Sequence, residues 1–324
     1  MRIVIPDDYQ HVIRTLDCFT RLAGHEVTVL HQAKPASLDE LAERFADADA
    51  LVLTRERTRI DAALLERLPK LKLISQTGKV AGHLDLAACT AQGVVVTEGR
   101  GSPVAPAELA WALILNARRQ LVPAIDAFRQ GQWQVNMGQA LAGQVLGVWG
   151  YGKIGQRLAR YAQAFDMPVL VWGSEASRAA AQADGHRAAA SREAFFAEAD
   201  ILSLNLRLAD STRHGVTLAD LGQMKPDALL VNVSRAELIA PGALLQALDA
   251  GRPGFAAVDV FEQEPLLDPN HPLLRHPRVL STPHLGYVEK NGYELYFGDA
   301  FDNVLAFFNG SPVNVANPQA LGKR

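Results

Sequence analysis

Short apolar runs alternate with helical segments along almost the whole chain, and this alternation limits the possible folds more than any other feature. The expected strands in the first third of the sequence are residues 2–5, 26–30, 50–54, 71–75 and 94–97. The expected helices between them are residues 38–45, 62–67 and 85–92. Strands that alternate with helices in this way favour βαβ units, and therefore a parallel sheet.

A second series of strands and helices follows a long helical segment. Residues 106–130 are rich in alanine and leucine and predict one long helix that contains Pro123. The second series covers residues 144–282, and residues 293–308 return to a helical pattern. A length of 324 residues suits two domains of ordinary size. The expected domains are residues 1–98 together with 287–324, and residues 99–286 inserted between these parts.

The composition indicates a globular protein rather than a nucleic-acid-binding or membrane protein. The net charge is −3, and the basic residues form no run that would attract nucleic acid or an anionic membrane. Cys18 and Cys89 are too few for a disulfide framework and have no metal-ligand neighbours, so we expect no metal site. The first apolar run is too short for a signal peptide, and no run reaches the length of a membrane span. We expect a cytoplasmic protein.

A glycine-rich turn begins the second series. Residues 145–155 read VLGVWGYGKIG, which follows an apolar strand and opens a helical pattern. In this context G-x-G-x-x-G predicts a dinucleotide site, because the glycines allow a tight turn, a close approach of pyrophosphate and close helix packing. The helix start would direct N–H groups at the phosphates. The expected cofactor-binding residues here are Gly150, Gly152, Lys153, Ile154 and Gly155.

The next strand does not end in the acid that usually binds the ribose of NAD. Gly173 stands there, followed by Ser174 and Glu175, with Arg178 one turn later. Glu175 could bind the ribose, Ser174 and Arg178 could accept a 2′-phosphate, or these residues could simply open a solvated helix. We favour NAD as the cofactor, with Ser174 at the site, and the sequence does not exclude NADP.

Three further strands end in residues suited to catalysis. Residues 226–242 read PDALLVNVSRAELIAPG, residues 254–265 read GFAAVDVFEQEP, and residues 278–286 read RVLSTPHLG. The carboxyl ends of parallel strands lie at one edge of a sheet, where ligands bind in open α/β folds. An arginine, an acidic turn and a histidine are therefore expected on one rim.

These segments, in this order and spacing, resemble the D-isomer-specific 2-hydroxyacid dehydrogenases. The resemblance covers nearly the whole chain and is most specific in VLGVWGYGKIG, LLVNVSRAELI, AAVDVFEQEPL and TPHLG. It implies two doubly wound parallel-sheet domains, with a Rossmann dinucleotide-binding domain inserted into a flavodoxin-like substrate-binding domain. It also implies hydride transfer between NAD(P)(H) and a small D-2-hydroxy acid or 2-keto acid. By position, it assigns catalysis to Arg235, Glu264 and His284, and cofactor contacts to Ser234 and Asp259.

The chemistry requires residues of these types. Oxidation of an alcohol by hydride loss needs a base, and histidine exchanges protons near neutral pH. A neighbouring glutamate favours the charged imidazolium and fixes its orientation. Arginine matches a carboxylate with two parallel donors and can polarise the adjacent carbonyl. Glu262 competes with Glu264 for the role of partner on spacing alone.

The first domain is expected to bind the substrate's carboxylate. Residues 75–85 read SQTGKVAGHLD, where the family has a turn whose N–H groups bind that anion, so Gly78, Lys79 and Val80 are the expected substrate-binding residues. Lys79 departs from the family's usual small residue and would either add positive charge beside the anion or remain a solvated lysine. Asn205 and Arg207 also depart from the usual histidine and proline.

The resemblance further implies a homodimer. An apolar surface on the long helix would suit a two-fold interface, unless the helix packs it against its own domain; its residues are Trp111, Leu113, Ile114 and Leu115. A dinucleotide-sensing protein, like the corepressors that share this fold, is the alternative to an enzyme. Such proteins keep the same three catalytic residues, but this chain shows no added interaction tail or basic segment.

Overall fold

The computed structural model describes residues 1–32 and 37–323, and the chain forms two compact units. Unit 1 consists of Met1–Ser102 and Val288–Arg324, and unit 2 consists of Pro103–Tyr287. The sequence placed the corresponding divisions after residues 98 and 286.

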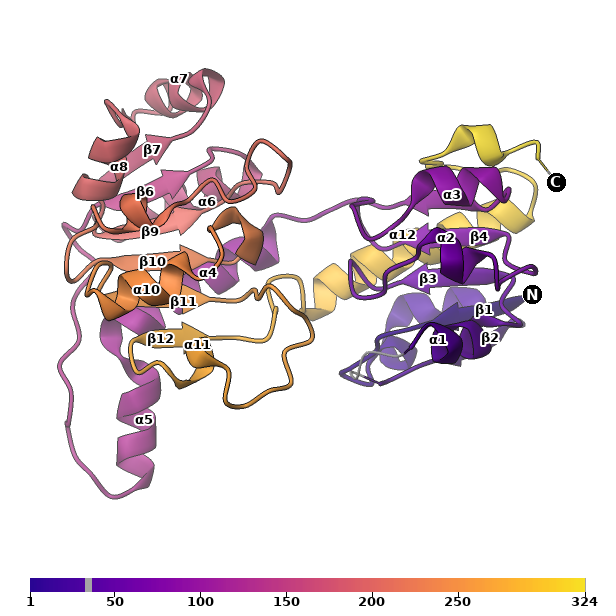
Figure 1. Ribbon diagram of the computed structural model, residues 1–324, viewed down its shortest axis with the longest axis horizontal. Coiled ribbons are helices and arrows are strands. Elements are labelled where there is room, and N and C mark those ends of the chain that lie inside the picture. Colours follow the sequence, from indigo (N-terminus) through magenta and orange to yellow (C-terminus); the bar gives the residue numbers. More distant parts are fainter. Residues whose placement is uncertain (33–36, 324) are drawn as a thin grey trace. The chain divides into compact units, whose positions relative to one another are not determined.

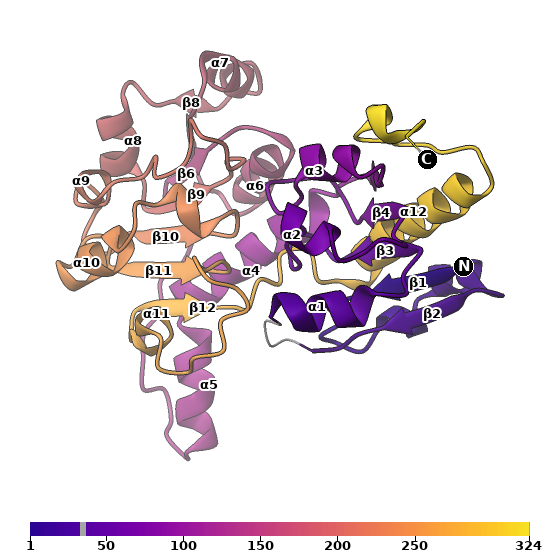
Figure 2. The ribbon, with the colours of Figure 1, turned by 45° about the vertical axis from the view of Figure 1, so that its right-hand side comes forward.

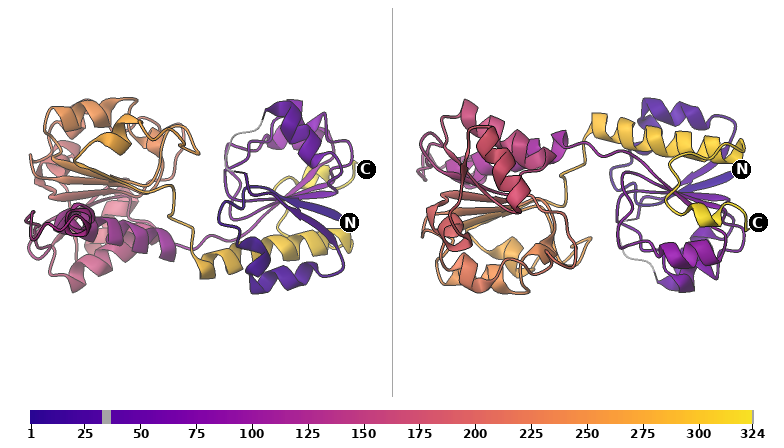
Figure 3. Two further views of the ribbon diagram at one scale, coloured as in Figure 1. Left: turned by 90° about the horizontal axis from the view of Figure 1, so that it is seen from below. Right: turned by 90° about the horizontal axis from the view of Figure 1, so that it is seen from above.

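Unit 1 is built on a parallel sheet with the strand order β2-β1-β3-β4-β5 (Figure 1). This 2-1-3-4-5 order is that of flavodoxin-like folds. The helix α12 and the short helix η2 pack on one face of the sheet, whereas α1, α2 and α3 pack together over the other (Figure 3). The elements are β1 (Arg2–Ile5), η1 (Ile13–Thr15), η2 (Asp17–Leu22), β2 (Glu26–Val29), α1 (Leu38–Phe45), β3 (Ala50–Leu53), α2 (Ala62–Leu65), β4 (Leu73–Gln76), α3 (Leu86–Ala91), β5 (Val95–Glu98), α12 (Lys290–Phe308) and η4 (Pro318–Ala320).

Local sequence explains these boundaries. Ser37 and Glu40 form a capping box at the start of α1, and Asp85 caps α3 by accepting a hydrogen bond from the Ala88 N–H group. Gly93 ends the α3 segment with a φ of +69°, which glycine adopts without a steric penalty. The expected strands and helices of the first third are therefore found to within a few residues.

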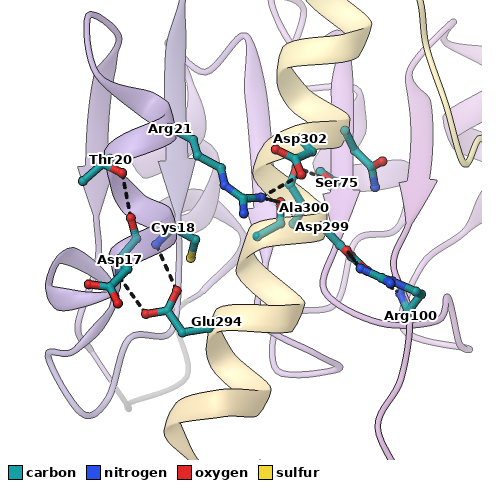
Figure 4. A network of polar contacts seen from close by, with 12 residues as sticks. Asp17, Cys18, Thr20, Arg21, Ser75, Arg100, Glu294, Asp299, Ala300 and Asp302 are labelled. Atoms are coloured by element: carbon teal, nitrogen blue, oxygen red, sulfur yellow. Dashed lines mark hydrogen bonds and ion pairs between the residues drawn. The ribbon is translucent and has the colours of Figure 1, made fainter.

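The last long helix, α12, belongs to unit 1 because polar side chains bind it there (Figure 4). The Glu294 carboxylate accepts hydrogen bonds from the Asp17 and Cys18 N–H groups, at 2.6 and 2.9 Å. Asp299 receives Arg100 through two side-chain bonds, at 3.0 and 2.7 Å. The contacts of Glu294 join residues 277 and 276 positions apart in the chain, and those of Asp299 join residues 199 positions apart.

Unit 2 contains a parallel sheet with the order β12-β11-β10-β9-β6-β7-β8 (Figure 2). Counted within the unit, this is the Rossmann order 3-2-1-4-5-6 with one further strand. The predicted fold class is therefore confirmed. The elements are α4 (Val104–Arg119), α5 (Leu121–Arg129), β6 (Leu146–Trp149), α6 (Lys153–Ala164), β7 (Val169–Trp172), α7 (Glu175–Ala183), β8 (Arg187–Ala188), α8 (Arg192–Glu198), β9 (Ile201–Leu204), α9 (Leu218–Leu221), β10 (Leu229–Asn232), η3 (Ala236–Leu238), α10 (Ala243–Asp249), β11 (Phe255–Val258), α11 (Pro272–Arg275) and β12 (Val279–Ser281).

The prediction of one long helix over residues 106–130 is wrong in one respect. The segment forms two helices. The α4 helix ends at Arg119, Gln120 adopts a left-handed conformation with φ +50°, and α5 starts at Leu121. Pro123 is the physical reason. Its ring would clash with the carbonyl group of Arg119 in a continuous helix, whereas the third position of a new helix needs no N–H donor.

The prediction of an apolar dimer surface on this helix is also wrong, and the helix packs these residues against its own domain. Trp111, Leu113 and Ile114 are buried within unit 2, and Leu115 packs against the same cluster. This cluster forms because α4 lies against α6 and against strands β10 and β11. Exposed apolar side chains instead follow the break in the helix, at Leu121, Val122, Ile125, Phe128, Trp133, Val135 and Met137.

Across residues 1–32 and 37–323, no helix combines the length and the apolar character that crossing a bilayer requires.

Candidate active site

The loop after β6 has the form of a dinucleotide cradle. Gly150 has φ +98°, and a Cβ atom there would lie 2.8 Å from the carbonyl oxygen of Asn205. A Cβ atom on Gly155 would overlap the carbonyl oxygen of Gly150. Contacts within the protein therefore require glycine at both positions, whether or not a cofactor is bound. Around Gly152, the described residues leave the position of a Cβ atom free to a radius of 4 Å, which fits the close approach of a pyrophosphate.

The helix α6 begins directly after this loop. Gly152 is its N-cap, and within the described residues no side chain caps it. The N–H groups at Lys153 and Ile154 thus lie at the positive end of a helix of 12 residues. Such a helix start binds phosphate groups, so this segment fits the pyrophosphate of NAD(H).

The side chains after β7 have local contacts. Gly173 has φ +151°, and the Ser174 hydroxyl oxygen accepts a hydrogen bond from the Ser177 N–H group at 3.2 Å, which caps α7. The Arg178 guanidinium lies 4.8 Å from the ring centre of Trp172. Ser174 therefore serves as a helix cap, and its contact with a cofactor stays a prediction.

The turn after β10 holds Arg235 through Asn232. The buried Asn232 amide donates to the Arg235 carbonyl at 2.8 Å and accepts from the Ser234 N–H group at 3.0 Å. The Ser234 hydroxyl donates to the Leu204 carbonyl at 2.8 Å, at the end of the neighbouring strand β9. Arg235 is half-buried, and its Nη1 donates to the Ser234 carbonyl at 2.6 Å. The main chain at Arg235 is thus fixed to two strands.

Asp259 follows β11 and closes the turn that carries His284. Its Oδ1 accepts hydrogen bonds from the Thr282 hydroxyl at 2.6 Å and the Leu285 N–H group at 2.7 Å, and its Oδ2 accepts from the Gly286 N–H group at 2.8 Å. Burial raises the pKa of the Asp259 carboxyl above its ordinary value. Asp259, which the resemblance assigns to a cofactor contact, thus also has a clear structural task.

His284 and Glu264 are in direct contact. The His284 Nδ1 atom lies 2.5 Å from the Glu264 Oε2 atom, and the other carboxylate oxygen accepts the Phe261 N–H group at 2.9 Å. The two side chains are 24% and 32% exposed, so both remain accessible to solvent or substrate. Glu262, the competing glutamate, instead lines a pocket of about 180 Å³ beside Ala236 and Phe261.

The His284 backbone adopts an uncommon conformation. Its φ is +51°, in the left-handed region that residues other than glycine rarely occupy. Its N–H group donates to the Thr282 carbonyl at 3.0 Å, and its ring meets the edge of Tyr287, with centroids 5.4 Å apart. Surroundings that hold a residue in such a conformation are frequent at active sites.

The expected anion-binding turn lies in unit 1, after β4. Gly78 has φ +80°, as a tight turn requires. The Lys79 ammonium group lies 2.5 Å from Glu98 Oε1, and the Val80 N–H group donates to Glu98 Oε2 at 3.1 Å. The positive charge that Lys79 was expected to add is therefore paired with a carboxylate of the same unit.

Sequence reasoning missed Asn232, Thr282 and Glu98 as residues that shape the site. Each stands at or just after the end of a parallel strand, and that position is the signal that could have identified them. Asn205, which departs from the family pattern, donates its N–H group to the Trp149 carbonyl at 2.8 Å and so supports the glycine loop.

The chain is similar to several known proteins. Residues 111–286 match a family described as D-isomer specific 2-hydroxyacid dehydrogenase, NAD binding domain. A glyoxylate reductase from Aeropyrum pernix is 34% identical, over 93% of this chain and 92% of its own length. A glyoxylate reductase from Thermococcus litoralis is 33% identical over 92% of each protein. The crystal structure of a phosphoglycerate oxidoreductase from Vibrio cholerae has a TM-score of 0.93 and 54% identity, over 96% of this chain and 99% of that one.

Proposed function

Because the chain belongs to the D-isomer-specific 2-hydroxyacid dehydrogenases, which are NAD-dependent oxidoreductases, we propose that it interconverts a small D-2-hydroxy acid and the corresponding 2-keto acid. The observation that carries the proposal is the 2.5 Å contact between His284 Nδ1 and the Glu264 carboxylate. Two such atoms share a proton, because facing lone pairs at this distance would repel each other. The proton at Nδ1 leaves Nε2 as the atom that exchanges a proton with substrate.

In the reductive direction, NADH held by the glycine loop would supply the hydride for the carbonyl carbon. His284 Nε2 then donates a proton to the carbonyl oxygen, and the Glu264 carboxylate stabilises the imidazolium form before the transfer. In the oxidative direction, neutral His284 accepts the proton of the alcohol. The hydrogen bonds that Asp259 accepts from the Leu285 and Gly286 N–H groups fix the main chain next to His284.

Arg235 has the role of binding the substrate's carboxylate and polarising the adjacent carbonyl. Its guanidinium offers two parallel donors that match a carboxylate, which an ammonium group does not. Asn232 and Ser234 fix its main chain, so the side chain starts from a defined position. Gly78, Lys79 and Val80 of unit 1 also bind the substrate in this proposal, as the family resemblance implies.

The cofactor is NAD(H), held by the glycine loop from Gly150 to Gly155 and by the start of α6. Ser174, Ser234 and Asp259 contribute further contacts. The names of the two related glyoxylate reductases make glyoxylate the first keto acid to examine.

We also propose a homodimer, as the family resemblance implies. Its interface would use the exposed apolar side chains of α5, among them Ile125 and Phe128, rather than the buried Trp111. Light scattering on the wild-type protein and on a Phe128→Glu variant tests this, because a charge at a buried interface position disfavours association.

The function is tested by measuring NADH and NADPH oxidation with a panel of 2-keto acids that includes glyoxylate, hydroxypyruvate and pyruvate. We expect turnover of at least one of them by the wild-type protein. His284→Ala should lower kcat by roughly 10²- to 10⁴-fold, the usual contribution of an acid–base group. Binding of NADH without turnover of any keto acid in the panel would contradict the proposal and indicate a dinucleotide sensor.

A further inference from the structure

The turn assigned to the substrate's carboxylate already contains a carboxylate of the protein. Both oxygens of Glu98 are used there, one by the Lys79 ammonium group at 2.5 Å and the other by the Val80 N–H group at 3.1 Å. These are the donor types that an incoming carboxylate needs: a positive charge and a main-chain N–H group. Glu98 therefore makes the contacts that are expected of the substrate.

The backbone of Glu98 is fixed. Its N–H group donates to the Asn314 carbonyl at 3.0 Å, and its carbonyl accepts from the Asn303 side chain at 3.2 Å. Glu98 also pairs with Gln76 in the register of β4 and β5. Only its side chain can leave the turn without breaking the sheet.

Exposure makes that movement feasible. The side chain of Glu98 is 27% exposed and that of Lys79 is 64% exposed, so the carboxylate can exchange its two partners for water. Ion pairs with this much solvent contact contribute little to stability. The contact is strong enough to fill the turn and weak enough to be displaced by a ligand.

We propose that Glu98 is an internal competitor for the substrate's carboxylate, which binds Lys79 and Val80 by displacing the Glu98 side chain. This inference rests on the proposed function, in which Gly78–Val80 binds the substrate. Two carboxylates cannot share these donors without repulsion, so the negative charge of Glu98 lowers the affinity for anionic substrates. Neutralising Glu98 should therefore raise the affinity for an anionic substrate. It should not change the affinity for an analogue that has no charged carboxylate.

The experiment compares Glu98→Gln with the wild-type protein, using glyoxylate and its uncharged methyl ester as substrates with saturating NADH. We expect the KM for glyoxylate to fall by roughly two- to fivefold, the scale of a partly exposed charge contact, while kcat changes less. The KM for the ester should stay within experimental error. The ester separates displacement of a charge from a general change in the shape of the turn.

A matched control is Glu26→Gln, which removes another exposed carboxylate of the same sheet, 3.1 Å from Arg2. Its KM values should equal those of the wild-type protein. If Glu98→Gln does not fold, Glu98→Ala provides the same comparison, and melting temperatures identify the folded variants.

Two outcomes overturn the inference. An unchanged KM for glyoxylate in Glu98→Gln, together with a raised KM in Lys79→Met, leaves the substrate role of the turn intact and refutes competition by Glu98. Equal increases of KM for glyoxylate and for the ester show that Glu98 only maintains the turn. Failure of the proposed function is distinct, because the wild-type protein would then turn over no keto acid.

Discussion

Replacement of Glu264 by glutamine tests the arrangement around His284 most directly. The Glu264 carboxylate accepts two hydrogen bonds, from His284 and from the Phe261 N–H group. A glutamine side chain has one acceptor oxygen and one NH₂ group, so it can keep only one of these bonds. With its oxygen toward Phe261, its NH₂ group faces the protonated Nδ1. With its oxygen toward His284, its NH₂ group faces the Phe261 N–H group.

The size of the effect follows from the lost bond. A hydrogen bond to a charged group contributes about 1.5–3 kcal/mol, and the lower half of this range applies to side chains about a quarter to a third exposed. At about 1.4 kcal/mol for each factor of ten, kcat/KM for keto-acid reduction should fall roughly 10- to 40-fold at neutral pH. The imidazolium also loses its negative partner. Proton donation to the keto acid is therefore less favourable, which also lowers the rate of reduction.

The assay is steady-state reduction of the best keto acid across pH, in parallel for Glu264→Gln, Glu264→Asp and Glu262→Gln. Glu264→Asp keeps the charge on a shorter side chain and should recover part of the lost activity. Glu262→Gln is the matched control in the same turn and should match the wild-type profile. The assignment is refuted if Glu264→Gln behaves like the wild-type protein while Glu262→Gln lowers kcat/KM.

Three further predictions use separate parts of the structure. Arg235→Lys should lose most of kcat/KM while the Kd for NADH stays nearly constant, because a lysine cannot form two parallel bonds to a carboxylate; near-normal turnover would exclude this role. Gly152→Ala should keep the melting temperature of the wild-type protein but raise the Kd for NADH, measured by fluorescence titration, because the added methyl group occupies the open space of the loop. The hydrogen bonds from Arg100 lower the pKa of Asp299, so this contact stabilises the protein above the ordinary aspartate pKa and is lost as pH falls below it. Asp299→Asn should therefore lower Tm by a few degrees at pH 7 and by much less near pH 3; an equal loss at both values would contradict the ion pair's contribution.

The order of strands and helices follows from the sequence, because it depends on local periodicity and on turn residues. Apolar runs such as 50–54 and caps such as Asp85 act within a few positions of the chain. The family was recognised in the same way, from contiguous motifs in a fixed order, and the matched family model confirms it. The glycine loop is equally local, since Gly150 and Gly155 contact each other across one turn.

Tertiary structure alone decided the contacts between distant residues. Spacing could not choose between Glu262 and Glu264, because the choice depends on which carboxylate meets a histidine 20 positions later in the chain. Helical periodicity placed Trp111 on an apolar face of its helix, but it did not show what covers that face. In the folded chain, α6 and the sheet cover it. In the sequence, Lys79 has no nearby acidic partner. In the folded chain, the pairing of β4 with β5 places Glu98 beside it. Such contacts join positions that only the folded chain brings within a few ångströms, and their energies depend on that separation.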